Sequence, residues 1–161
     1  LYGRAALQLG FQTPLPEHAL SRDVDAVFWI GQAEALSAET NFWLAIDEII
    51  AELADQELYI SHFFTEDQVI LRPDWRFKRL DIPGDWLHLQ LHRLSNEDLL
   101  LSKLMRDDPL DRKDAIFIVN ASGFERETIK DLLGKARVPD IPEIQEQFGI
   151  ASEKLLAALP A

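Results

Sequence analysis

A short apolar stretch near the start of the chain, Val24 to Ile30, most constrains what the chain can fold into. Its β-branched and aromatic residues favour a buried strand over a short helix. Two carboxylates, Asp23 and Asp25, stand at the beginning of this strand. Residues i and i+2 of a strand point to the same face, with Cα atoms roughly 7 Å apart, so both carboxylates can bind one or two divalent cations. The alternative is structural, with Asp23 in a turn and Asp25 at a solvated edge.

The N-terminal half combines predicted helices and strands. Residues 1–10 favour a helix that ends at Gly10, and a periodic apolar face predicts an amphipathic helix over residues 39–55. After that helix the apolar period changes to two, which indicates strands. The predicted strands cover residues 58–64, 69–71, 75–82 (with a bulge at Lys78) and 86–94.

From Ser95 onward every predicted element is a helix. Ser95 and Asp98 resemble a capping box at a helix start. By composition Ala115 to Val119 could be a buried strand, but the apolar spacing, with Gly123 as a natural stop, favours a helix. The predicted helices cover residues 97–105, 111–121, 125–135 and 143–158.

Strands that precede helices in this way indicate an α+β fold. We expect a small mixed β-sheet with an appended helical half. The predicted core spans residues 1–94, and the helical region, residues 95–161, packs on it to form one compact unit.

Composition excludes several classes of protein. The net charge of −12 repels nucleic acid in general, but it is compatible with a metal-binding cleft or a basic protein partner. There is no apolar run of about 18 residues, so we expect no membrane span. The absence of cysteine fits a reducing cytoplasm. The chain opens on Leu1 rather than Met, and we expect that residues precede it.

The histidines do not predict a metal site. His88 and His92 are four residues apart, which on a strand is roughly 13 Å and too far for one ion. We therefore expect both to be surface residues. His18 and His62 have no partner at ligand spacing and are interpreted as ordinary.

Four segments in a fixed order form one combined pattern. They are Gly3 to Gly10, Ser21 to Asp25, Glu97 to Leu104 and Asp111 to Asp114. The pattern resembles the minimal nucleotidyltransferase-like superfamily, particularly the bacterial abortive-infection toxin type and its poorly characterised relatives. Members open with a helix carrying Gly-Gly or Gly-Ser, followed by a strand with two aspartates. A helix with a lysine and a segment with two further aspartates come later.

The resemblance implies a mixed sheet whose first strand binds Mg²⁺ and the triphosphate of a nucleotide through Asp23 and Asp25. It implies Mg²⁺-dependent transfer of a nucleotidyl group from a nucleoside triphosphate to an RNA or protein acceptor. By position, the resemblance also implies a nucleotide-binding set. That set is Gly3, Arg4, Lys103, Asp111 and Asp114.

The chain departs from the family pattern at two places. The Gly-Ser dipeptide that grips phosphates is replaced by Gly3-Arg4, which has no hydroxyl. Active members also carry a third carboxylate on a neighbouring strand, and the strand predicted at residues 86–94 has none. Its candidates here lie in turns or near strand ends, or the third carboxylate is absent. The candidates are Glu66, Asp67, Asp81 and Asp85.

Two alternatives follow from these departures. The first is a catalytically degenerate fold that acts as a binding module or as one component of a toxin–antitoxin-like pair. The second is an acidic scaffold that binds a basic partner through its C-terminal helices.

Overall fold

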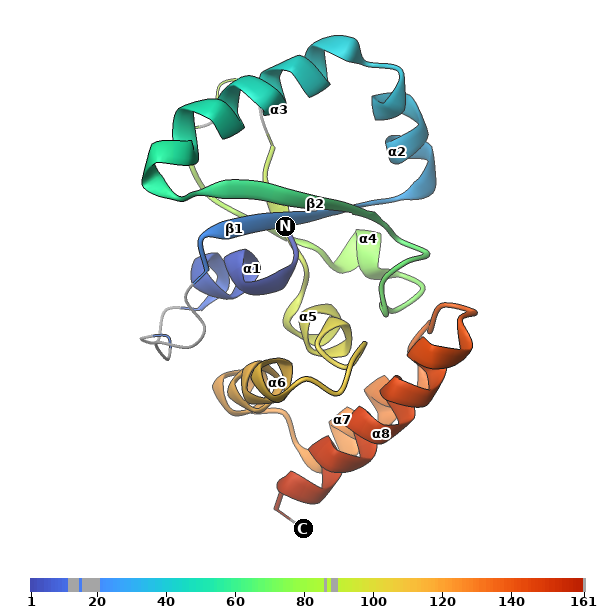
Figure 1. Ribbon diagram of the computed structural model, residues 1–161. Coiled ribbons are helices and arrows are strands. Elements are labelled where there is room, and N and C mark those ends of the chain that lie inside the picture. Colours follow the sequence, from blue (N-terminus) through green and yellow to red (C-terminus); the bar gives the residue numbers. More distant parts are fainter. Residues whose placement is uncertain (12–14, 16–20, 86, 88–89, 161) are drawn as a thin grey trace.

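The computed structural model describes residues 1–11, 15, 21–85, 87 and 90–160. Helices and strands are interspersed as far as β4, and only helices follow (Figure 1). The elements are α1 (Gly3–Gly10), β1 (Asp23–Phe28), α2 (Ile30–Ser37), α3 (Thr40–Leu53), the 3₁₀ turn η2 (Ala54–Gln56), β2 (Tyr59–Thr65), α4 (Trp75–Lys78), β3 (Leu80–Asp81), β4 (His92–Arg93), α5 (Asn96–Ser102), α6 (Pro109–Ser122), α7 (Arg126–Gly134) and α8 (Pro142–Ala158). The predicted α+β class is confirmed.

The strands of the described residues form two separate two-stranded sheets rather than one mixed sheet. β1 and β2 pair in parallel, with an irregularity in register between Val24 and Asp25. Parallel strands need a long crossover connection, and α2 and α3 supply it. β3 and β4 form a short antiparallel pair. Figure 1 shows α2 and α3 on one side of the β1–β2 pair and α1, α5 and α6 on the other.

The side of the sheet under α3 is filled by aromatic rings. Phe28 of β1 and Phe63 of β2 stack at 5.5 Å, and Phe42 and Trp43 of α3 meet Phe63 edge to face. Such offset and T-shaped pairs suit the ring quadrupole. No residue of α3 is fully buried, so this helix contributes mainly these edge contacts.

The main core lies on the opposite side of the sheet, around α5. Leu99, Leu100 and Leu101 are consecutive and all fully buried, which requires neighbours on every side of the helix. Leu7 of α1 and Ile118 of α6 belong to the same cluster. No helix of the described residues is long and apolar enough to cross a bilayer.

The predicted strands of residues 69–94 are largely wrong. Val69 to Leu71 is buried, but its only sheet contact is an isolated bridge from Leu71 to Arg137. The first part of the strand predicted at residues 75–82 is instead the helix α4, in which Trp75 is buried and Phe77 is 84% exposed. Of the strand predicted at 86–94 only His92–Arg93 is seen, and part of the rest (86, 88 and 89) lies outside the described residues.

The helical predictions for the C-terminal half are confirmed. Residues 111–121 lie within α6, which ends at Gly123 in the left-handed conformation, φ 65°. At the start of α5 the Ser95 hydroxyl accepts the Asp98 backbone N–H, as the capping box predicts. The predicted division of the chain at residue 94 stays a prediction.

The Asp98 carboxylate of this cap is fully buried and holds Arg72. It accepts hydrogen bonds from the Arg72 backbone N–H at 2.9 Å and from Arg72 Nη2 at 2.8 Å. The Ser95 hydroxyl donates a further bond at 2.9 Å. A buried ion pair of this kind is costly to break on one side, because the remaining charge loses its partner.

We therefore expect Asp98→Asn to lower the free energy of unfolding by about 3–5 kcal/mol, since Arg72 would lose its buried partner and keep only the more distant carboxylate of Glu97, at 3.7 Å. Urea denaturation would measure the change. The matched control is Asp131→Asn, which removes a pair with Lys135 in which both side chains are 63% exposed. It should cost less than about 1 kcal/mol. Equal effects of the two substitutions would contradict this role of Asp98.

Candidate functional site

A cavity of about 530 Å³ lies between β1, the start of α1 and the segment that joins α5 to α6. Most of the predicted site residues line it, although they come from distant parts of the sequence. The predicted residues in its lining are Gly3, Arg4, Asp23, Asp25, Lys103 and Asp111. The remaining one, Asp114, is fully buried behind the wall, where it contacts Lys103 and Arg4.

Two carboxylates from β1 form one wall of the cavity. The Ser61 hydroxyl of β2 lies 2.7 Å from Asp25 Oδ1 and 3.5 Å from Asp23 Oδ2, so both carboxylates face the same space. His62 Nδ1 lies 3.1 Å from Asp25 Oδ1. The Ser21 hydroxyl donates to Asp23. The strand thus brings its two carboxylates together, as its sequence predicts.

The start of α1 is joined to the same strand at Asp25. The Tyr2 backbone N–H donates to the Asp25 carbonyl at 3.0 Å. Gly3 has φ 67°, and a Cβ atom there would lie 2.9 Å from Asp25 Oδ2. Glycine is therefore required twice, by the left-handed backbone and by the closeness of the carboxylate.

Opposite the carboxylate wall lies a cluster of paired charges around Lys103. The Lys103 ammonium is buried and lies 2.8 Å from Asp114 Oδ2 and 3.2 Å from Asp111 Oδ1. Arg4 Nε lies 3.2 Å from Asp114 Oδ2, and Arg106 Nε contacts Asp111 Oδ2. Through these ion pairs the cluster connects α6 both to α1 and to the end of α5. The Lys103 ammonium is therefore held in place by the carboxylates of Asp111 and Asp114.

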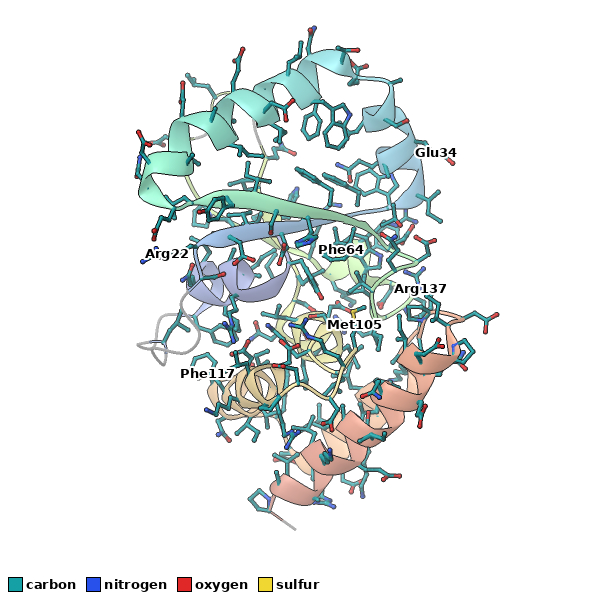
Figure 2. The ribbon with its side chains drawn as sticks, in the orientation of Figure 1. Arg22, Glu34, Phe64, Met105, Phe117 and Arg137 are labelled. Atoms are coloured by element: carbon teal, nitrogen blue, oxygen red, sulfur yellow. The ribbon has the colours of Figure 1, made fainter. Side chains whose placement is uncertain are left out.

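The apolar part of the cavity includes Tyr2, Phe64 and Met105. Figure 2 labels Phe64 beside the sheet and Met105 beside α5. The Tyr2 and Phe64 rings meet edge to face at 5.4 Å, and the Tyr2 hydroxyl lies 3.7 Å from Met105 Sδ. Burial, with the nearby charges of Asp111 and Asp25, raises the pKa of Tyr2 to about 12. Tyr2 is thus a neutral hydrogen-bond donor at physiological pH.

None of the four candidates for a third carboxylate lines the cavity. Glu66 accepts the Trp75 indole N–H at 2.8 Å, and Asp81 contacts His92. Asp67 and Asp85 are exposed. Within the described part of the chain, no three acidic, histidine or cysteine side chains are arranged to hold a metal ion.

The oxygen donors at the β1 wall nevertheless suit Mg²⁺. This ion keeps several waters and is commonly bound by one or two carboxylates together with substrate phosphates. Asp23 and Asp25 supply two carboxylates that share the Ser61 hydroxyl. The two aspartates therefore suit Mg²⁺ without a third protein ligand.

Several residues of the cavity were missed from the sequence. His62, interpreted as ordinary, faces Asp25 because β2 pairs in parallel with β1 and places the two residues side by side. Tyr2 and Arg106 also line the cavity. Arg106 carried one available signal, since it is a second basic residue only three positions beyond Lys103.

Comparisons with protein-family models, with curated proteins and with solved structures gave no match. The resemblance to nucleotidyltransferase-like proteins therefore rests on the sequence motifs alone.

We expect Gly3→Ala to destabilise the protein by about 1–3 kcal/mol, because alanine is strained at this backbone conformation and would press on Asp25. Thermal or urea unfolding would measure the change. Gly149→Ala is the matched control, since a Cβ atom there meets nothing within 4 Å. On the helical backbone of α8 it should stabilise the protein by about 0.5–1 kcal/mol. An unchanged stability of Gly3→Ala would contradict the close packing described here.

The raised pKa of Tyr2 predicts a pH dependence of stability. The folded state keeps the phenol proton more tightly than the unfolded state, so the contribution is complete below pH 10 and is lost as pH rises toward about 12. We expect the free energy of unfolding to fall less steeply in Tyr2→Phe than in the wild type across this window. Urea denaturation at several pH values would measure both slopes. Identical slopes would contradict the burial of this phenol.

Proposed function

We propose that this chain is a nucleotidyltransferase-like protein that transfers a nucleotidyl group from a nucleoside triphosphate to an RNA or protein acceptor with Mg²⁺. The observation that supports this best is the convergence of the motif residues on one cavity. Asp23 and Asp25, Gly3 with Arg4, Lys103, and Asp111 come from four separate segments of the sequence. Residues that shared only a superficial motif would not be expected to line the same space.

The arrangement of elements supports the same proposal for the fold type. The aspartate pair stands at the start of a strand that follows a glycine-bearing helix, and the C-terminal helical half supplies the lysine and two further aspartates. We propose a nucleotidyltransferase-type core with an appended helical half, acting in the bacterial cytoplasm.

Each residue of the cavity has a role in this proposal. Asp23 and Asp25 would hold Mg²⁺, which when bound supplies positive charge to the phosphates. The absence of a side chain at Gly3 lets the start of α1 approach the Asp25 carboxylate closely. Arg4 presents a guanidinium that can bind phosphate in place of the missing serine hydroxyl. Asp114 pairs with both Arg4 and Lys103, so it holds that arginine in position, and Lys103 adds a buried positive charge.

One observation favours a second candidate function, a catalytically degenerate binding module or a toxin–antitoxin-like component. Beside Asp25, the neighbouring strand β2 presents Ser61 and His62 rather than a carboxylate. A site without a third carboxylate can bind a nucleotide with Mg²⁺ and still transfer it slowly or not at all.

Incorporation of labelled nucleotide into RNA or protein acceptors tests the proposed transfer. We expect labelling that needs Mg²⁺ and is abolished by a chelator. Combined Asp23→Asn and Asp25→Asn should reduce it by about a hundredfold or more, since both proposed metal ligands lose their charge. Asp47→Asn on α3 is the control, because Asp47 is exposed and does not line the cavity.

Labelling that is unchanged in the double variant would contradict a catalytic role of the aspartate pair. Calorimetry with Mg²⁺ and nucleoside triphosphates separates the two candidate functions. Binding without labelling favours the degenerate module, and binding with turnover excludes it. Absence of both binding and labelling would contradict the proposed function.

A further inference from the structure

The cations of the cavity differ in what they can offer an anionic ligand. Lys103 has an ammonium group that is buried and bonded to two carboxylates, so it has little capacity left for a phosphate. Arg4 and Arg106 are more accessible, with side chains that are 23% and 72% exposed. The two arginines are therefore the cations that a ligand in this cavity meets first.

Each of these two arginines is held by an aspartate through the Nε atom of its guanidinium. Arg4 Nε donates to Asp114 Oδ2, and Arg106 Nε donates to Asp111 Oδ2. Across the described residues, the terminal Nη groups of these two side chains make no hydrogen bond. A planar guanidinium held by its Nε keeps a fixed orientation, and its Nη groups remain available for bidentate binding of phosphate oxygens.

Arg106 and the aspartate pair line the cavity from different elements. Arg106 follows α5, whereas Asp23 and Asp25 belong to β1. Tyr2 lines the same cavity, and the charges of Asp25 and Arg106 both act on its phenol. A phosphate chain held at the aspartate pair would reach Arg106 through this shared space.

The charge balance of the lining explains why such a ligand would need a metal ion. Among the described lining residues there are four carboxylates and three cations. The carboxylates are those of Asp23, Asp25, Asp108 and Asp111, and the cations are Arg4, Lys103 and Arg106. Asp23 and Asp25 would repel a phosphate chain unless a divalent cation neutralised them, whereas the two arginines attract phosphate directly.

We infer that Arg106 is a specificity-determining residue that binds the terminal phosphates of a nucleoside triphosphate and discriminates against the monophosphate. The inference rests on the proposed function of the same cavity. It adds the residue that distinguishes nucleotides by their number of phosphates. Arg4 directly follows Gly3, which lies against the Asp25 carboxylate, so we assign it the phosphates closer to the nucleoside.

Calorimetry on the full chain tests this inference. Each ribonucleoside triphosphate and its monophosphate would be titrated with Mg²⁺ into the wild type, Arg106→Gln and Arg106→Lys. We expect Arg106→Gln to weaken triphosphate binding by about tenfold or more, as the loss of charge-assisted hydrogen bonds predicts. Monophosphate binding should hardly change. Arg106→Lys should be intermediate, because lysine keeps the charge but not the fork.

Arg112→Gln is the matched control. Arg112 is also a partly exposed arginine paired with an aspartate, Asp107, but it does not line the cavity. It should bind both ligands as the wild type does. Circular dichroism melting would verify that every variant is folded, and the exposed position of Arg106 favours a folded variant.

The outcomes separate this inference from the proposed function. Triphosphate binding that is unchanged in Arg106→Gln, or weakened equally for triphosphate and monophosphate, would overturn the role of Arg106 and leave the proposed function intact. A wild type that binds no nucleotide with Mg²⁺ would overturn both.

Discussion

The buried ion cluster of Lys103, Asp111 and Asp114 is the constraint on which the cavity depends. Charges removed from water cost several kcal/mol each unless they are paired, so the positions of these three groups are interdependent. Arg4 extends the cluster to α1. Because α1 is also joined to β1 at Asp25, the cluster indirectly fixes the distance between the two walls of the cavity.

Much of the fold was predictable because its signals are local. The periodic faces and caps of the long helices predicted α3, α6, α7 and α8 to within a few residues, and the β-branched run predicted β1. The segment from Trp75 to Leu94 was not predictable, because its alternation of apolar and charged residues fits a strand as well as a short helix with an exposed Phe77. Pairing of the strands into two sheets depends on contacts that no local pattern contains.

The candidate site likewise contains residues that sequence motifs identify and residues that only the tertiary structure identifies. Asp23, Asp25 and Lys103 carry motif signals, and the structure brings them to one cavity. Tyr2 and His62 carry none, because their importance arises only from tertiary placement beside Asp25. The sequence motif identifies Lys103 as a candidate phosphate-binding residue. Only the tertiary structure shows that Asp111 and Asp114 pair with its ammonium, so that it holds neighbouring elements together rather than binding phosphate.

A crystal structure with Mn²⁺ in place of Mg²⁺ and a non-hydrolysable nucleoside triphosphate would locate both ligands directly. Our account predicts an anomalous peak for Mn²⁺ bound by Asp23 and Asp25, and a phosphate chain that crosses the cavity to Arg4 and Arg106. A metal ion or nucleotide bound elsewhere on the chain, with this cavity filled only by solvent at saturating ligand, would contradict the proposed site.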